Sequence, residues 1–318
     1  MEAVTLLADI GGTNARFALC RDGRPTEPLV LATRDFDDLA DALMHALRTL
    51  GAPALQGMAA CAAGPPEEGA IRLTNCPWVV SESVLAGFVD AGPVVLVNDF
   101  TAQAAALAGL GDTDLRAVGC GEPRRGAPRA VIGPGTGLGL SASLPAPGGE
   151  AYVTGEGGHV SLAAATEEED RILARLRGRF GHVSAERVLS GDGLVNLYRA
   201  MNPEARHEAL STGEAIAARA RSGDARALAC VRQFCAWLGA VAGDVALTFG
   251  AQGGVYLTGG ILPAWGDLFA EGVFRERFEA KGRYTRYLGR IPTWLIVARH
   301  PALVGLARLL EQGSARRW

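Results

Sequence analysis

The chain has 318 residues, 48% of them hydrophobic, and its formal net charge of −3 leaves no basic stripe, so we expect no nucleic-acid partner. This length predicts about two domains by the usual ~150-residue prior, with a large buried core. The chain begins with no basic leader, and no run reaches the ~18 apolar residues of a membrane span, which predicts a soluble cytoplasmic protein without a membrane partner.

The first predicted strand ends at an aspartate beside a glycine-rich turn. Residues 4–8 form a short apolar run of strand length, Asp9 follows, and residues 15–20 indicate a second strand. The letters IGGT between them contain two glycines, which let backbone amides approach anionic oxygens closely. A strand, a glycine turn and a second strand in this order suit a nucleotide phosphate and its metal ion.

Each residue of this turn has an expected role. Gly11 and Gly12 leave space for phosphate, Thr13 can add a hydroxyl donor, and Asp9 is expected to face Mg2+, directly or through water. Taken alone, the segment is also compatible with an ordinary hairpin turn. The rest of the chain has to decide between these two interpretations.

Strand-like and helix-like segments alternate after this turn. Residues 37–50 have the spacing of an amphipathic helix, and residues 57–63 and 94–97 have the composition of buried strands. This alternation predicts an α/β protein in which helices cover mostly parallel or mixed sheets.

Two polar residues follow the strand at 94–97. Asn98 and Asp99 lie between this strand and an alanine-rich, helix-favouring stretch at 104–107, so Asp99 occupies a strand-to-helix junction. Such junctions place side chains at the mouth of an α/β crevice, where ligands usually bind. The alternative is that Asp99 only caps the helix, which is a common role for aspartate at a helix start.

A second glycine turn repeats the theme of the first. The strand at 130–132 leads into GPGTGLG at 133–139, about 120 residues after the first turn, which indicates two related halves with one phosphate loop each. The dinucleotide fingerprint GxGxxG fails, because Leu138 or Leu140 occupies the position of its last glycine. A simple glycine-rich strand connection is the alternative interpretation.

Glu156 and His159 lie in the glycine-rich segment GEGGH, which could orient a hydroxylated ligand. A metal site is not indicated, because HExxH is absent and no second His or Cys has suitable spacing. A polar turn with a satisfied histidine is the alternative. Residues 166–169 then form a capping box that predicts a helix to about residue 178.

The later segments add one further polar candidate and one further turn. Glu186 follows Ser184 at a predicted helix start, where it could simply complement the positive end of the helix dipole. Residues 224–249 predict a long, largely buried helix, followed by a strand at 254–258. A turn at 259–263 comes next and could meet an adenine or ribose.

Lysine and cysteine usage excludes other classes of site. Lys281 is the only lysine and has no glycine-rich lead, so a Walker A loop is absent and a Schiff-base lysine is not indicated. The six cysteines form no CxxC pair, and we expect them to be reduced packing residues.

Together these segments resemble the bacterial glucokinases, within the sugar-kinase and actin-like ATPase superfamily. The resemblance runs from Leu7 to about Leu309, and the ordered set is more specific than any single motif. The segments that carry it are DIGGTNARF from residue 9, NDFTAQAAAL from 98, GPGTGLGLS from 133, GEGGHVSL from 155, GHVSAERVLSGDGLVNLYRA from 181 and LTGGILP from 257.

The resemblance implies sites for ATP, Mg2+ and glucose. The residues that it assigns to the nucleotide and its phosphates are Ala8, Asp9, Ile10, Gly11, Gly12, Thr13, Gly135, Thr136, Gly137, Gly259 and Gly260, with Asp9 also near Mg2+. Those that it assigns to the sugar are Asn98, Asp99, Glu156, His159 and Glu186. Asp99 would be the general base for the sugar 6-hydroxyl as that oxygen attacks the γ-phosphoryl group.

The resemblance also implies the architecture, a two-domain actin-like ATPase (ribonuclease H-like) α/β fold with a cleft between a small and a large domain. The small domain would comprise residues 1–109 and about 301–318, and the large domain residues 110–300. Closure of the cleft would exclude water, which could otherwise consume ATP. We expect a homodimer. We also expect no structural zinc, because the cysteine-rich zinc motif of the related repressor and open-reading-frame kinases is absent.

The implied activity is transfer of the γ-phosphoryl group of ATP to the 6-hydroxyl of glucose. A kinase for another hexose is an alternative, and so is a non-catalytic sugar-responsive regulator, although Asp99 is present. ADP or polyphosphate also remains open as the donor, because backbone amides recognise phosphate more than its source. Pro134, where relatives carry a small residue, removes one amide donor from the second loop.

Overall fold

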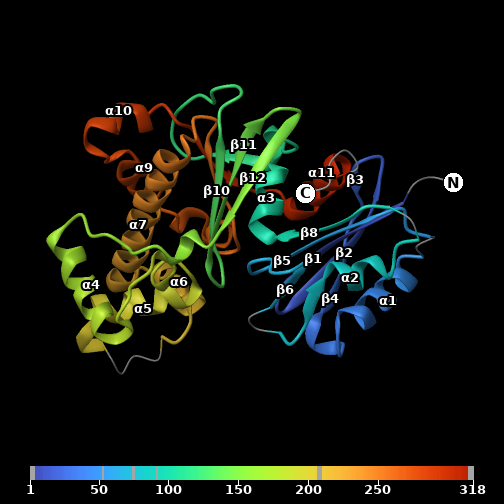
Figure 1. Cartoon of the computed structure of the whole chain (residues 1–318). Helices are drawn as coiled ribbons and strands as arrows, with labels where there is room; N and C mark the ends of the chain where they lie inside the picture. Colours follow the sequence, from blue (N-terminus) through green and yellow to red (C-terminus); the bar gives the residue numbers. More distant parts are fainter. Residues whose placement is uncertain (1–3, 52–53, 74–75, 91, 206–209, 314–318) are drawn as a thin grey trace. The chain divides into compact units, whose positions relative to one another are not determined.

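The computed structural model describes residues 4–51, 54–73, 76–90, 92–205 and 210–313. The chain divides into two compact units, each built from more than one segment (Figure 1). Unit 1 comprises Met1–Asp114, Ser141–Gly155 and Ala298–Trp318, and unit 2 comprises Leu115–Leu140 and Glu156–Val297. The C-terminal segment therefore belongs to the same unit as the N-terminal strands.

Unit 1 contains one larger sheet, a small two-stranded sheet and four α-helices. Its strands are β1 (Thr5–Ile10), β2 (Asn14–Arg21), β3 (Arg24–Pro25), β4 (Leu29–Ala32), β5 (Met58–Ala62), β6 (Ala70–Arg72), β7 (Val79–Ser81), β8 (Val94–Asn98) and β12 (Gly149–Gly155). Its helices are α1 (Leu39–Thr49), α2 (Glu82–Ala86), α3 (Asp99–Ala106) and α11 (Pro301–Gly313), with the short 3-10 helices η1 (Thr33–Asp35) and η2 (Asp112–Asp114).

Unit 2 is richer in helix. Its strands are β9 (Leu115–Ala117), β10 (Arg129–Pro134), β13 (Val255–Leu257) and β14 (Thr293–Ile296), and β11 (Leu138–Ala146) begins in unit 2 and continues in unit 1. Its α-helices are α4 (Glu167–Phe180), α5 (Gly191–Met201), α6 (Gly213–Arg221), α7 (Ala225–Phe249), α8 (Ile261–Trp265), α9 (Glu271–Glu279) and α10 (Thr285–Leu288). Its 3-10 helices are η3 (Gly157–His159), η4 (Ala185–Arg187), η5 (Pro203–Ala205), η6 (Gly266–Leu268) and η7 (Gly282–Tyr284).

The sheet of unit 1 has the order β3-β2-β1-β5-β8, with β4 on β2. β1 pairs antiparallel with β2 and parallel with β5, and β5 pairs parallel with β8. Alternate residues of a strand pack into two different hydrophobic cores, because successive side chains point to opposite faces of the sheet. Leu6 and Ile10 join the core that contains α1, whereas Leu7 and Cys61 join the core that contains α11. Helices therefore cover both faces, as the alternating pattern predicted.

The second sheet repeats this order of elements. Its strand order is β12-β11-β10-β13-β14-β9, with β13 parallel to both β10 and β14. A three-residue turn at 135–137 joins β10 to the neighbouring β11, as the turn at 11–13 joins β1 to β2. Each sheet thus has a glycine-turn hairpin followed by two parallel strands. The prediction of two related halves is confirmed at the level of topology.

α11 packs closely on α3 in unit 1 because a glycine lies where the two helices meet (Figure 1). A Cβ added at Gly305 would overlap the carbonyl carbon and oxygen of Ala102 in α3. Leu303 and Leu306, next to this glycine, are buried in the core that also contains Ala102. Arg308 adds a polar contact, since its Nε donates to the carbonyl of Ala105 at 3.1 Å. The C-terminal helix is thereby fixed to the helix that begins at Asp99.

The long helix α7 forms the centre of unit 2. It is the single helix among the described ranges that is long and apolar enough to cross a membrane by length and composition, and 67% of its most apolar window is buried inside the structure. Trp237 and Phe234 are fully buried, and Trp237 Nε1 donates to the Ala163 carbonyl at 3.0 Å. Gly239 and Gly243 let α9 approach so closely that an added Cβ at either position would meet a carbonyl of α9. The predicted long buried helix is confirmed.

Glu169 joins three helices of unit 2 through a buried carboxylate. Its side chain is 1% exposed and accepts hydrogen bonds from Arg277 Nη1 at 2.6 Å and Gln233 Nε2 at 2.7 Å. Burial raises the pKa of Glu169, but hydrogen bonds from Arg277, the Ala165 amide and Gln233 outweigh it and lower the pKa below its ordinary value. The predicted cap is present as well, because Thr166 accepts from the Glu169 amide at 3.2 Å.

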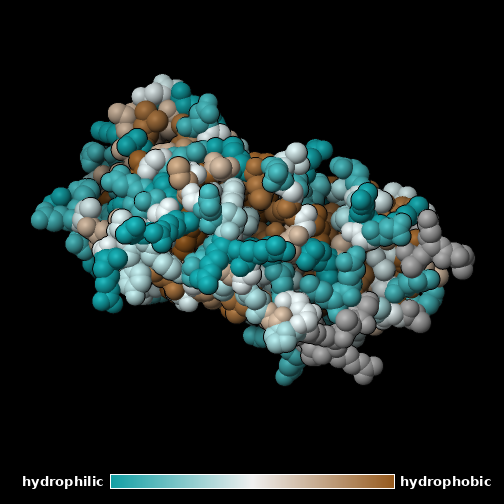
Figure 2. All heavy atoms as spheres, turned by 90° about the horizontal axis from the view of Figure 1, so that it is seen from above, coloured by the Kyte–Doolittle hydropathy of each residue, from teal (hydrophilic) through white to brown (hydrophobic). Residues whose placement is uncertain are grey.

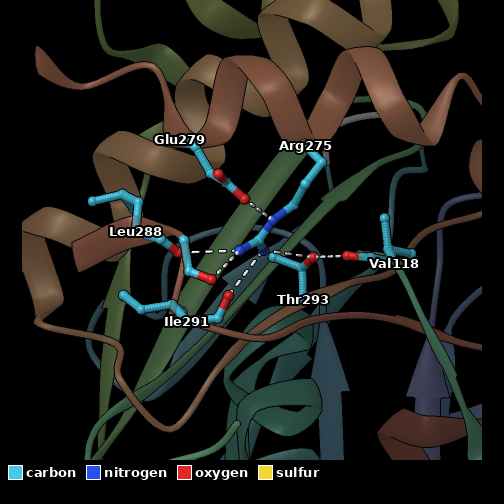
Figure 3. A network of polar contacts seen from close by, with 7 residues as sticks. Val118, Arg275, Glu279, Leu288, Ile291 and Thr293 are labelled. Atoms are coloured by element: carbon cyan, nitrogen blue, oxygen red, sulfur yellow. Dashed lines mark hydrogen bonds and ion pairs between the residues drawn. The ribbon is translucent and has the colours of Figure 1, made fainter. Parts of the chain in front are cut away.

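A second buried charge, Arg275 of α9, organises the end of α10 and the start of β14 (Figure 3). Its Nη2 donates to the Leu288 and Gly289 carbonyls at 3.1 and 3.3 Å, and its Nη1 donates to the Ile291 carbonyl at 2.8 Å. Its Nε donates to Glu279 at 2.6 Å. A guanidinium has five N–H donors, and here they satisfy carbonyl groups at a helix C-terminus, where positive charge is favourable.

Two local predictions need correction. The turn predicted at 259–263 ends at Gly260, because Ile261 already begins α8 and Pro263 is tolerated in the first turn of a helix. Cys120 is exposed and is not a packing residue, whereas Cys20, Cys61, Cys230 and Cys235 are buried as expected. All six cysteines are free.

The visible face in Figure 2 is mostly hydrophilic, with hydrophobic residues in smaller areas between. The large hydrophobic residues that are exposed are scattered along the chain and comprise Val30, Met44, Val79, Val160, Tyr284 and Val297. Single exposed residues of this kind are normal on a protein surface. They do not identify a dimer interface, so the expected homodimer stays a prediction.

We predict that Gly305→Ala destabilises the protein by about 1–3 kcal/mol, because the new methyl group overlaps the α3 backbone and the helices must separate. Gly178→Ala in α4 is the matched control. Nothing lies within 4 Å of an added Cβ at that position, so the better helix propensity of alanine should stabilise by about 0.5–1 kcal/mol. Chemical denaturation of both variants tests this, and equal stability of the two would contradict the close approach at Gly305.

Candidate functional site

The first glycine turn, at 11–13, is held by Thr33, a residue that the sequence did not indicate. The Gly11 amide donates to the Asn14 carbonyl at 3.0 Å, which closes the turn. Thr33 then binds the outer part, since its Oγ1 donates to the Gly12 carbonyl at 2.9 Å and its amide donates to the Thr13 carbonyl at 3.0 Å. The carbonyl oxygens of Gly12 and Thr13 are thereby both paired within the protein.

The amides of Gly12 and Thr13 donate to no group in the described part of the chain. Thr13 is exposed, and both glycines are half-buried. Amides that point outward from a rigid turn form a site for an anion such as a phosphate. The segment is a hairpin turn in geometry, and its two unused amides are compatible with a phosphate, so the two interpretations do not exclude each other and phosphate binding stays a prediction.

Asp9 lies at the end of β1 between a cation and a thiol. Arg16, its register partner on β2, donates from Nη1 to Asp9 Oδ2 at 3.3 Å, and Cys61 Sγ on β5 lies 3.6 Å from Asp9 Oδ1. The side chain of Asp9 remains 23% exposed. Within the described ranges, no group of three or more His, Cys, Asp or Glu residues could hold a metal. One carboxylate that completes its shell with phosphate oxygens and water is what Mg2+ commonly uses.

Asp99 is the first residue of α3, but Asn98 caps this helix. Asn98 Oδ1 accepts from the amides of Phe100 and Thr101 at 2.9 and 3.4 Å, and Asn98 Nδ2 donates to the Gly64 carbonyl at 3.1 Å. The interpretation that Asp99 only caps the helix is therefore wrong, because its neighbour does so. Asn98 is 9% exposed and has one side-chain N–H left for a ligand.

Asp9 and Asp99 face the same buried thiol in unit 1. Burial raises the pKa of Cys61 well above its ordinary value, and the negative charges of Asp9 and Asp99 raise it further. Cys61 thus stays a neutral thiol and can donate to Asp9. The fold brings the predicted metal residue and the predicted base to one edge of the sheet, at the ends of the neighbouring strands β1, β5 and β8.

The second glycine turn, at 135–137 in unit 2, has the same internal design. The Gly135 amide donates to the Gly137 carbonyl at 2.8 Å, and the Gly135 carbonyl accepts from the Gly191 amide at 2.9 Å. Among the residues that the structure places, none accepts from the amides of Thr136 or Gly137. The second turn therefore offers outward amides as the first does, and a simple strand connection does not require this arrangement.

Glu186 connects the second turn to His159. Its Oε2 accepts from the Leu138 amide at 2.9 Å, and its Oε1 lies 3.8 Å from His159 Nε2. The helix that it belongs to, η4, is a single 3-10 turn capped by Ser184, so a helix dipole does not explain its position. The carboxylate is 31% exposed and keeps lone pairs for a ligand.

The GEGGH segment packs against the strand that leaves the second turn. A Cβ added at Gly158 would overlap the Leu138 carbonyl, and one at Gly157 would overlap the Leu140 side chain. His159 is 59% exposed at its side chain, and Glu156 is exposed. The glycines are thus needed for packing, while the two polar side chains remain accessible.

Gly259, followed by Gly260, lies against the end of the strand that leads into the second turn. Gly259 has a φ of +87°, and a Cβ added there would overlap the Pro134 carbonyl at the end of β10. Gly260 precedes α8, and nothing lies within 4 Å of a Cβ added to it. Within unit 2, Glu186 therefore lies against the second turn itself, and the GEGGH segment and Gly259 lie against the strand residues on either side of that turn.

Three residues around these sites were missed by the sequence analysis. Arg16 could have been found, because it lies opposite Asp9 in the antiparallel register of β1 and β2. Cys61 could have been found only by pairing β1 with β5, and Thr33 depends on how β4 and η1 return to the first turn. No local pattern marks the last two.

We predict that Gly137→Ala destabilises the unliganded protein by about 0.5–1.5 kcal/mol. The new Cβ would overlap Glu186 Oε2, so the flexible end of this side chain must shift and its hydrogen bond with the Leu138 amide is disrupted. Gly135→Ala is the matched control in the same turn, because nothing lies within 4 Å of a Cβ added there. Thermal unfolding without ligand measures both, and a Gly137→Ala variant as stable as Gly135→Ala would contradict this role of Glu186.

Comparison with known proteins assigns the chain to a family. The Glucokinase family profile matches residues 6–313. The chain is 48% identical to "Glucokinase" of Paramagnetospirillum magneticum over 98% of each chain, and 45% identical to "Glucokinase" of Chromobacterium violaceum over 98% of this chain and 90% of that one. Each match extends over nearly the whole of this chain and of the relative.

Solved structures share the fold. The crystal structure of glucokinase from an Antarctic psychrotroph is 34% identical, with a TM-score of 0.89 over 98% of this chain and 100% of that one. A ROK family glucokinase from Streptomyces griseus, solved in complex with glucose and AMPPNP, is 22% identical with a TM-score of 0.66 over 98% and 100%. The chain has the two-domain actin-like ATPase fold. The chain belongs to the glucokinase family of ATP-dependent hexose kinases.

Proposed function

We propose that this chain transfers the γ-phosphoryl group of ATP to the 6-hydroxyl of glucose, with Asp99 as the general base. The observation that carries the assignment of the base is the position of Asp99, which begins α3 at the end of β8 and acts on the same buried Cys61 thiol that contacts Asp9. Family membership supports the reaction, and the neighbouring ROK glucokinase was crystallised with glucose and AMPPNP.

Asp99 accepts the proton of the sugar hydroxyl in this proposal. The hydroxyl oxygen forms a bond to the γ-phosphorus, the bond from phosphorus to the bridging oxygen of ADP breaks, and ADP leaves with the bonding electrons. A carboxylate that is half-buried, as Asp99 is, can accept this proton without a large change in its solvation. Asp99 therefore contributes by position and by accepting the proton.

The two glycine turns hold the phosphates. The outward amides of Gly12, Thr13, Thr136 and Gly137 are suitable donors for phosphate oxygens, and their turns are closed by internal hydrogen bonds before any ligand binds. Gly259 and Gly260 are proposed to lie along the nucleoside. Pre-formed turns reduce the entropy lost on binding, which favours a tight complex with ATP.

Asp9 is the residue that would hold Mg2+, together with phosphate oxygens and water. The bound ion would offset negative charge on the transferred group. Arg16 and Cys61 keep the Asp9 carboxylate in one orientation, and its partial exposure leaves access for a hydrated ion. The fit supports Mg2+, whereas the absence of zinc stays a prediction.

Glu156, His159, Glu186 and Asn98 are proposed to bind the remaining sugar hydroxyls. Their side chains present acceptors and donors that are exposed or only partly used by the protein. Several hydrogen bonds to one sugar fix the attacking oxygen relative to the base, which lowers the entropic part of the barrier. Another hexose that differs at one hydroxyl would leave a polar group unpaired, and this favours glucose. A cytoplasmic homodimer is part of the same proposal.

We predict that Asp99→Asn lowers kcat by about 100-fold or more, because the amide keeps the shape but cannot accept the proton. Binary glucose affinity should stay within several-fold. Asp170→Asn, at an exposed carboxylate on α4, is the control and should keep the activity. A coupled assay for ADP release and calorimetry with glucose provide the measurements. Near-normal turnover of the Asp99→Asn protein would overturn the assignment of the base.

A further inference from the structure

Unit 2 contains a cavity of about 320 Å³ that lies outside the residues assigned to ATP and glucose. Helices α4 and α5 form its walls, and the start of η5 closes one side. The residues that line it are Arg175, Leu176, Arg179, Asn196, Arg199, Ala200 and Pro203. Three of these residues are arginines, all of them exposed, and none is acidic, so the cavity is open to solvent and carries positive charge.

Two of the arginines are held in place by the protein. Arg175 Nη1 donates to the Ala200 carbonyl at 2.8 Å, and Arg179 Nη1 donates to Asn196 Oδ1 at 2.9 Å. The Arg179 guanidinium also lies over the Phe180 ring, 4.6 Å from its centroid. Each anchored guanidinium keeps further N–H donors, so less side-chain entropy is lost when these donors bind a ligand.

The positive charge of the cavity is not balanced by the protein around it. None of the carboxylates that the structure describes forms an ion pair with Arg175, Arg179 or Arg199. Arg175 and Arg179 are four residues apart on α4, where like charges repel. Arg199 of α5 brings a third positive charge to the same space. This arrangement favours an anion between the two helices.

We propose that this cavity binds a phosphate monoester of a small metabolite. Guanidinium groups match phosphate oxygens with paired N–H donors, and three of them can neutralise a dianion. The volume is at the lower end of the range for small-molecule sites, which suits a phosphate with a short carbon chain. Leu176 and Ala200 give the apolar contact that distinguishes such an ester from inorganic phosphate.

Two hydrogen bonds connect Arg179 in the cavity to the backbone of Arg187, next to Glu186. Asn196, which accepts from Arg179, donates from Nδ2 to the Arg187 carbonyl at 3.1 Å. Arg187 is the next residue after Glu186, and α5 itself begins at Gly191, whose amide binds the Gly135 carbonyl. A ligand that moves Arg179 therefore shifts Asn196 and the backbone that positions Glu186. This regulatory part rests on the proposed function, in which Glu186 binds sugar.

Calorimetric titration tests the site independently of catalysis. Glucose and AMPPNP are kept at saturating concentration, and glycerol 3-phosphate or inorganic phosphate is titrated into the protein. Glycerol 3-phosphate should bind the wild type more tightly than inorganic phosphate does. Arg199→Gln should weaken its binding on the order of tenfold, as expected for the loss of a charge-assisted hydrogen bond. Arg177→Gln, at an exposed arginine of α4 outside the cavity, should bind as the wild type does.

The outcomes separate the site from its regulatory effect. No binding to the wild type, or equal binding to Arg199→Gln and Arg177→Gln, overturns the site. Equal affinity for the two probes shows that the site recognises only the phosphate group and overturns the preference for a monoester. If the site holds, glycerol 3-phosphate should change the glucose KM of the wild type about fivefold, and Arg199→Gln should abolish the change. An unchanged glucose KM overturns only the coupling between the cavity and Glu186. A protein without glucose kinase activity would overturn the proposed function, whereas the calorimetric difference between Arg199→Gln and Arg177→Gln would still support the site.

Discussion

The hydrogen bond from the Leu138 amide to Glu186 is the interaction on which the ligand-binding part of unit 2 depends. It joins the strand that leaves the second phosphate turn to the carboxylate proposed to bind sugar, over a distance of 2.9 Å. His159 Nε2 lies 3.8 Å from the other carboxylate oxygen, so Glu186 also contacts a second residue that we propose to bind sugar. In the proposed function, phosphate binding and sugar binding therefore share one positioned group.

Glycine makes this arrangement possible through the space that it leaves. Gly137 admits the Glu186 carboxylate, Gly158 admits the Leu138 carbonyl and Gly259 admits the Pro134 carbonyl. Unit 1 uses a different device, in which Thr33 draws the carbonyls of the first turn inward and Arg16 holds Asp9. In both units the remaining turn amides have no acceptor among the described residues, and we propose them as donors to phosphate. A site of this kind is built before its ligand arrives, which lowers the cost of binding.

The sequence predicted the elements and the candidate residues better than their mutual contacts. The strand-turn-strand segments, the long helix α7 and the junction at Asp99 follow from local periodicity and from glycine spacing, both of which act over a few residues. The helix is capped by Asn98 and not by Asp99. The two possibilities differ by one residue in where the helix begins, and sequence patterns do not locate a helix end that closely. Thr33, Cys61 and Gly305 act through contacts between segments far apart in the chain, so only the folded structure reveals them.

Nucleotide affinity in the absence of sugar tests whether Glu186 positions the second turn as well as binding the sugar. Calorimetric titration of AMPPNP into wild type and Glu186→Gln, without glucose, isolates the effect on the phosphate turn. The amide of glutamine is a weaker acceptor for the Leu138 N–H than the carboxylate, so AMPPNP affinity should fall by roughly tenfold although Glu186 contacts no nucleotide in the proposal. An unchanged AMPPNP affinity, with only glucose binding weakened, would show that Glu186 contributes to sugar binding alone and would contradict its role in positioning the second turn.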